Sequence, residues 1–206
     1  MKKFFSVVPL QPKGFLKSVH YVAEGNSKLD MEGETCFPIM TAINGYAEPG
    51  EEFRVIAVQT ESDAVRHNGQ VMREELDSLC NRKGLNCPHG VEMISIETDE
   101  RVSAHVDTFQ KLLDYVDDDD ELFVCMTYGT KPLSTALMMA MQYAYRIKDN
   151  ASISCIVYGL MDRNVAPNVH KVYDMTALIQ LDEIVRILAE RGVTNPKEVI
   201  HGILEL

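Results

Sequence analysis

Residues 127–131, Thr-Tyr-Gly-Thr-Lys, carry the groups best suited to holding a phosphate in this sequence. They follow an apolar run of strand length, and Pro132 then stands at a typical first position of a helix. A glycine lets the backbone approach a ligand closely, and the amides and dipole of a helix start attract anions, with Lys131 adding charge. The segment matches neither G-x-x-x-x-G-K-S/T nor G-x-G-x-x-G, which disfavours nucleoside triphosphatases and dinucleotide-binding domains. The alternative to a phosphate site at residues 127–131 is an ordinary strand-to-helix turn that requires a glycine.

Other loops that follow apolar runs hold further candidate residues. In an open parallel sheet, ligands bind beyond the carboxyl ends of the strands. The amide of Asn68 suits the reading of a base edge, whereas a lone histidine such as His67 is more often a helix-start residue than a catalyst. The candidate ligand-binding residues in these loops are Pro9, Leu10, Gln11, Lys13, Gly14, Ser62, His67, Asn68, Gly159 and Met161. The candidate local positive charges are Lys13, Lys131, and Arg66 or Arg163.

Apolar runs of strand length alternate with helical patterns, and these elements must position the loops. The predicted strands are 4–8, 53–58, 91–96, 122–126, 153–158 and a short run at 171–173. The predicted helices are 68–83, 102–116, 131–147, 176–191 and 195–206. Nearly continuous β-branched and aromatic runs are typical of parallel strands buried on both faces. The alternation predicts an α/β fold: a Rossmann-like, doubly wound, mostly parallel sheet with helices on both faces.

Two helices carry more apolar surface than one face requires. Helix 131–147 is apolar over most of its circumference, which indicates either a buried helix or an oligomer face. The last helix begins at Asn195 and Pro196 and is apolar to its final residue, which suggests either a dimer surface or a piece cut from a longer protein. We expect one domain at 1–190 and a C-terminal helix at 191–206 that serves as a connector to an effector domain or as a dimerisation element.

Composition limits the classes of function. The 206 residues include 20 Lys and Arg against 31 Asp and Glu, a formal net charge of −11, which argues against broad coating of long nucleic acids. The five cysteines include no C-x-x-C pair, and Cys80, Cys87 and His89 fit no zinc template, so neither a metal nor a cofactor is predicted. No apolar run is long enough for a membrane span or a signal peptide, so we expect a cytoplasmic protein.

The acidic run 117–121 lies between a predicted helix and a predicted strand. Adjacent carboxylates repel one another unless their geometry converges, so a solvated loop is the simpler interpretation and a divalent-metal site is the alternative.

The order of three short motifs resembles the CRISPR-associated Rossmann fold (CARF) family. The motifs are Met126-Thr127-Tyr128-Gly129, then Ile156-Val157-Tyr158-Gly159, then Asp174-Met175-Thr176. They are similar to the D-x-T-H-G, I-x-Y-G and D-x-T segments of one subgroup, over about residues 1–190. Tyr128 stands where that subgroup often has histidine, and Met126 where it often has aspartate.

The resemblance implies a sensor of type III CRISPR immunity that binds cyclic tetra- or hexa-adenylate across the axis of a homodimer and controls an effector. It places Thr127, Tyr128, Gly129, Thr130 and Lys131 against phosphate and ribose, and the 9–14 loop near an adenine or the two-fold axis. The alternative is a metal-independent ring nuclease, in which Lys131 and Thr130 stabilise the transition state of an in-line attack. A generic nucleotide-binding Rossmann domain would need a phosphate fingerprint that this chain lacks.

Overall fold

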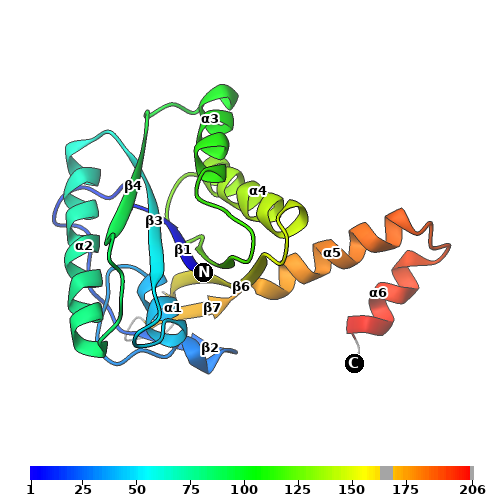
Figure 1. Ribbon diagram of the computed structural model, residues 1–206, viewed down its shortest axis with the longest axis horizontal. Helices are drawn as coiled ribbons and strands as arrows, with labels where there is room; N and C mark the ends of the chain where they lie inside the picture. The colour runs from blue at the N-terminus through cyan, green and yellow to red at the C-terminus, as the bar shows by residue number, and fades with distance from the viewer. Residues whose placement is uncertain (163–168, 205–206) are drawn as a thin grey trace. The chain divides into compact units, whose positions relative to one another are not determined.

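A computed structural model describes residues 1–162 and 169–204, with the side chains of 161 and 162 left out (Figure 1). Within it the chain forms two compact units, Met1–Asp174 and Met175–Leu206. The larger unit contains every residue predicted to bind the ligand, so it positions the candidate site.

The larger unit is built on a seven-stranded sheet in the order β2-β7-β6-β5-β1-β3-β4. The strands are β1 (Lys2–Val7), β2 (Tyr21–Glu24), β3 (Phe53–Thr60), β4 (Val91–Ile96), β5 (Glu121–Cys125), β6 (Ser152–Asp162) and β7 (Val169–Asp174). The strands from β6 to β4 run parallel, while β7 pairs antiparallel with β6 and parallel with β2. The predicted α/β class and mostly parallel, Rossmann-like sheet are confirmed.

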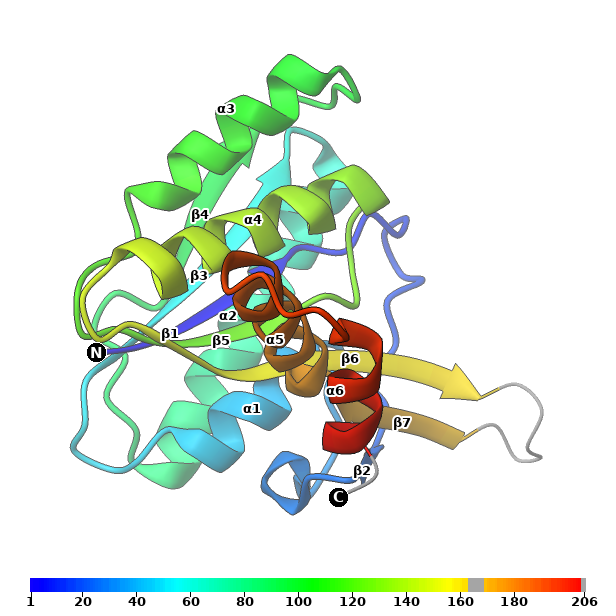
Figure 2. The same ribbon diagram turned by 90° about the vertical axis from the view of Figure 1, so that its right-hand side faces the viewer.

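Helices cover both faces of this sheet (Figures 1 and 2). The helices are α1 (Ile39–Tyr46), α2 (Asp63–Lys83), α3 (Val102–Leu113) and α4 (Lys131–Ile147), with a short 3-10 turn at Ser27–Leu29. The central strands are buried on both sides: Phe4 belongs to the core under α1 and α2, and Phe5 to the core under α3 and α4. Successive strand residues point to opposite faces, which explains why the strand sequences are continuous apolar runs rather than alternating ones.

The strand order reverses next to β1. After β1 the chain forms the edge strand β2 at the far side of the sheet, then returns to lie beside β1 as β3, continues outward to β4, and comes back to the other side of β1 as β5. The carboxyl ends of β1 and β5 therefore flank a topological switch point, where open α/β sheets bind their ligands. The loops that begin at Val8 and at Met126 leave the sheet at this point.

Several predicted boundaries are wrong. Helix α2 begins at Asp63 rather than at residue 68, because the Ser62 side chain accepts the N–H of Val65 and caps the helix earlier. Strand β6 continues beyond its last pairing with β5, Cys125 to Val157, and forms a hairpin with β7 (Figure 2). The edge strand β2 was not predicted, since it has only four residues and pairs with a strand about 150 residues away.

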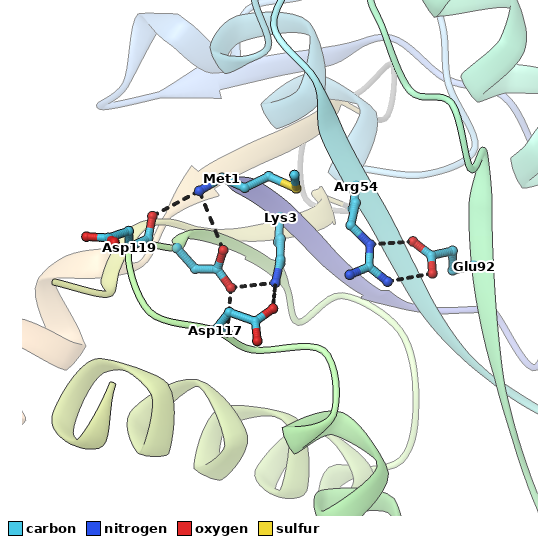
Figure 3. A network of polar contacts seen from close by, with 7 residues as sticks. Met1, Lys3, Arg54, Glu92, Asp117 and Asp119 are labelled. Carbon is cyan, nitrogen blue, oxygen red and sulfur yellow. Dashed lines mark hydrogen bonds and ion pairs between the residues drawn. The ribbon is translucent and has the colours of Figure 1, made fainter. Parts of the chain in front are cut away.

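The acidic run 117–121 contacts Met1 and Lys3 (Figure 3). The predicted solvated loop is confirmed for Asp117, Asp118 and Asp119, which are exposed, and is wrong for Asp120, which is buried. Asp120 is 2% exposed and forms an ion pair of 2.6 Å with the equally buried Lys3, while Asp117 binds the same ammonium at 2.7 Å. Asp118 and Asp119 accept hydrogen bonds from Asp149 and Asn150. The acidic run therefore neutralises a buried lysine near the amino end of β1, at the end of the strand opposite the switch point.

The smaller unit consists of α5 (Thr176–Glu190) and α6 (Pro196–Leu204), which contact each other. Neither helix contains a buried residue, although both have an apolar stripe. Large apolar side chains therefore stay exposed in this unit: Leu178, Val185, Ile187, Val199, Ile203 and Leu204. The predicted domain boundary at 190 stays a prediction. In the described part of the chain, no helix has the length and apolarity needed to cross a membrane.

Candidate functional site

A pocket of about 600 Å³ opens at the carboxyl edge of the sheet beside the switch point. It is lined by the loop that follows β1, the ends of β5 and β6, and the first residues of β2 and β7. The lining residues are Gln11, Phe15, Leu16, Lys17, Val19, Tyr21, Thr127, Tyr128, Gly159 and His170. The volume is in the range that holds small organic ligands, about 300–1,000 Å³.

Thr127 joins β5 to β6 on the pocket wall. Its Oγ1 accepts the backbone N–H of Gly159 at 2.8 Å and the thiol of Cys125 at 3.2 Å. Gly159 itself is glycine for reasons of packing, because a Cβ at this position would lie 2.5 Å from Pro38 Cγ. The two sequence motifs around Thr127 and Gly159 thus meet in space, and a hydrogen bond joins them on the pocket wall.

Tyr128 and Tyr21 form an aromatic part of the lining. The Tyr128 hydroxyl donates to the carbonyl of Cys36 at 2.7 Å. Burial raises the pKa of Tyr21 to about 12, and burial together with the charge of Tyr21 raises the pKa of Tyr128 well above its usual range. Both phenols are therefore neutral near pH 7, and neither is suited to act as a general base.

The turn after Tyr128 offers fewer free amides than the sequence predicts. Gly129 has φ +101°, in the left-handed region, and a Cβ there would approach Val7 Cγ1 to 3.1 Å. Thr130 caps α4 by accepting the N–H of Leu133 at 3.4 Å, and Pro132 has no N–H to offer. The first turn of α4 therefore leaves chiefly the N–H of Lys131 for an anion, and the Lys131 side chain is exposed.

Asn68 holds the loop after β1 rather than facing a ligand. Its side chain is fully buried, and Nδ2 donates to the carbonyls of Pro9 and Gln11, both at 2.9 Å. These two acceptors fix which end of the amide carries the hydrogens. Asn68 Oδ1 has no hydrogen-bond partner among the described residues. The predicted role in base reading is therefore wrong for this side chain, since its donors are occupied by the loop.

Most of the other residues predicted to bind the ligand lie outside the pocket lining. Ser62 is the cap of α2, and its neighbour Arg66 is ion-paired with Asp63 at 2.6 Å and so is no spare charge. His67 is half-buried on α2. Pro9 is buried, whereas three residues of the same loop are exposed and lie outside the pocket lining: Leu10, Lys13 and Gly14. The Met161 side chain and Arg163 lie outside the described part of the chain.

Sequence reasoning missed several of the lining residues: Phe15, Leu16, Lys17, Val19, Tyr21 and His170. Tertiary structure brings two of them together, since the parallel pairing of β2 with β7 places Tyr21 opposite His170. Their rings meet edge to face with centroids 5.9 Å apart. Because β2 was not predicted, nothing in the sequence linked these two positions.

The pocket combines aromatic rings with a small number of polar ends. Gln11 contributes an amide, Lys17 an ammonium group and His170 an imidazole, and none of the three side chains has a hydrogen-bonding or charged partner among the described residues. In the same part of the chain, no group of three or more His, Cys, Asp or Glu is arranged to hold a metal ion. The arrangement suits an organic ligand that has flat rings, hydrogen-bonding edges and negative charge.

Comparison of the chain with models of protein families gave no match, and comparison with curated proteins gave no significant match.

Proposed function

We propose that this chain is a CARF-like sensor domain that binds cyclic tetra- or hexa-adenylate. The observation that carries the proposal is the pocket at the switch point, where the loop after β1 meets the two motif segments that carry Thr127 and Gly159. The sequence resemblance predicts a ligand at these loops, and the described geometry offers a cavity there rather than a filled core.

The chemistry of the pocket supports a compact nucleotide ligand. Phe15 and His170 offer rings to a base, and Lys17 offers charge to a phosphate. Lys13 and Lys131 are further exposed cations on the two loops that border the pocket. A few local cations are sufficient for a small ring, although the whole chain carries −11.

An apolar groove between α3 and α4 supports the homodimer of this proposal. Val102, Val106 and Met139 are 78, 47 and 53% exposed around it, and the groove measures about 350 Å³. It also includes Pro132, which directly follows the phosphate-binding candidates Thr130 and Lys131. With a two-fold axis near this groove, each of the two subunits would supply the same cations to the ligand, which suits a ligand made of repeated units.

Ring cleavage is the second candidate function, and His170 is the observation that favours it. An imidazole that lines the pocket can take the proton of a ribose 2′-hydroxyl, whose oxygen then attacks the adjacent phosphorus and forms a 2′,3′-cyclic phosphate. The bond from phosphorus to the 5′-oxygen breaks, and this oxygen takes up a proton and leaves as a hydroxyl. Thr130 is occupied as a helix cap, so the earlier assignment of catalysis to Thr130 and Lys131 is replaced here by His170 with Lys17.

The two functions separate in one experiment. The full chain is incubated with labelled cyclic tetra- and hexa-adenylate, binding is measured, and the products are resolved over hours. Tight binding of an intact ring supports the sensor. Linear products that disappear in His170→Ala, while binding persists, support the nuclease. Absence of binding to both rings contradicts both functions.

A further inference from the structure

Among the side chains that line the pocket, the Gln11 amide is the one whose donor and acceptor lie side by side, so that both can pair with one base edge. A neutral His170 also has a donor and an acceptor, but these two nitrogens point away from each other and cannot pair with the same base edge. The hydroxyl of Tyr128 is donated to Cys36, and the hydroxyl of Thr127 is engaged by Gly159, so these groups are committed to the fold. The Lys17 ammonium only donates. The Gln11 amide is exposed at the pocket wall and can donate and accept at once.

The backbone of Gln11 is fixed even though its side chain is exposed. The carbonyl of Gln11 accepts Asn68 Nδ2 at 2.9 Å, and the carbonyl of Pro9 accepts the same amide at the same distance. Asn68 lies on α2 and is fully buried, so the loop is anchored to a helix of the core. Anchoring reduces the backbone entropy that the loop would lose on binding a ligand.

Aromatic side chains beside Gln11 supply surfaces on which a base can stack. Phe15 is 69% exposed, which leaves most of its ring available on the same loop. His170 also lines the pocket, and its ring packs edge to face with that of Tyr21. Stacking of a base on an aromatic side chain is worth about 1–3 kcal/mol and tolerates any base, so these rings provide affinity without selecting a base.

On the basis of the proposed function, we propose that Gln11 selects adenine in this pocket. A glutamine amide pairs with adenine through two hydrogen bonds, accepting from the N6 amine and donating to N7. Hypoxanthine and guanine present two acceptors, O6 and N7, so the amide oxygen of Gln11 would then face an acceptor. An arginine has the opposite preference, because its two donors match O6 and N7.

The test compares cyclic tetra-adenylate with cyclic tetra-inosinate, in which each adenine becomes hypoxanthine, by calorimetric titration of the full chain. The wild type should prefer the adenylate ring by roughly 5- to 150-fold for each base held, the range of one bidentate pair. Gln11→Leu should bring that ratio close to one, and Gln11→Arg should reverse it. Phe15→Ala should weaken both rings by similar factors and leave their ratio unchanged.

Gln70→Leu is the matched control, because Gln70 is an exposed glutamine of α2 outside the pocket lining, and it should keep the wild-type ratio. If the wild type binds the adenylate ring but Gln11→Leu keeps the wild-type preference, the role of Gln11 is contradicted and the proposed function stands. If the wild type binds neither ring, both are contradicted. Urea unfolding of each variant shows that the fold is intact, as expected for exposed side chains.

Discussion

At the scale of single residues, Gly129 joins a turn of the backbone to the packing of β1. Its backbone φ of +101° is a value that residues with a side chain rarely adopt, and a Cβ would also lie 3.1 Å from Val7 Cγ1. We expect Gly129→Ala to lower the free energy of unfolding by about 1–3 kcal/mol, measured by urea titration. Gly50→Ala is the control, because Gly50 has φ +83° with no atom within 4 Å of a Cβ. Equal losses in the two variants would show that the contact with Val7 contributes nothing.

Asn68 is the second residue whose role is structural. Replacing it with alanine leaves the carbonyls of Pro9 and Gln11 without their buried donor. We expect Asn68→Ala to cost about 1–3 kcal/mol of stability in urea unfolding, the range for an unsatisfied buried polar group. Asn81→Ala, at an exposed position of the same helix, should stay within about 0.5 kcal/mol of the wild type. A small effect at Asn68 would mean that water replaces the amide without cost.

The residues show what a sequence can and cannot predict about this site. Thr127 and Gly159 were identified because short motifs follow buried strands, and the sheet brings the ends of adjacent parallel strands together. The role of Asn68 depends on two carbonyls 57 and 59 residues away, which no local pattern encodes. His170 enters the pocket through the pairing of an edge strand too short to carry a periodic signal.

At the scale of elements, the first strand is held by an acidic loop, and this contact contributes to the response of the fold to acid. The hydrogen bond from Lys3 lowers the pKa of Asp117 below its usual range, and the hydrogen bonds from Arg54 lower the pKa of Glu92. A carboxyl whose pKa is lower in the folded state stabilises the fold above its unfolded pKa, and this contribution is lost as the pH falls through the folded value.

We therefore expect the free energy of unfolding to fall below about pH 4, near the ordinary pKa of aspartate. Asp117→Asn should flatten this part of the profile, measured by urea unfolding at several pH values between 2.5 and 7. Asp107→Asn changes an exposed carboxylate of α3 and should leave the slope as in the wild type. A profile for Asp117→Asn with the full wild-type slope would contradict the role of the Lys3 contact.

The helices α3 and α4 carry the element-scale prediction for assembly. The sequence predicted that residues 131–147 form a buried helix or an oligomer face. Leu137 of α4 is fully buried, whereas Met139 is 53% exposed, and the oligomer face stays a prediction. We expect Met139→Asp to convert a dimer into monomers in light scattering, because a carboxylate would be buried in the apolar groove. Val22→Asp, at an exposed position of the edge strand β2, is the control and should remain dimeric. A wild type that is monomeric with and without the ring contradicts the two-fold site.

At the scale of the whole molecule, the net charge of −11 governs the interaction with long nucleic acids, whereas the residues of the pocket govern the binding of a small ligand. Long nucleic acids gain affinity from many phosphate contacts, which an acidic surface opposes. Under the proposed function, a compact ring of four or six nucleotides would meet Lys17 and the aromatic side chains of one pocket rather than the acidic surface. The charge therefore favours a ligand small enough to enter the pocket.

The central claim is tested most directly by titrating the full chain with cyclic tetra- and hexa-adenylate in the presence of excess long single-stranded RNA. We predict saturable binding of at least one ring that the RNA does not displace, at one ring per two chains. Lys17→Ala should weaken this binding at least tenfold, because it removes the cation from the pocket wall. Failure to bind either ring, or displacement of the ring by the long RNA, would contradict the account.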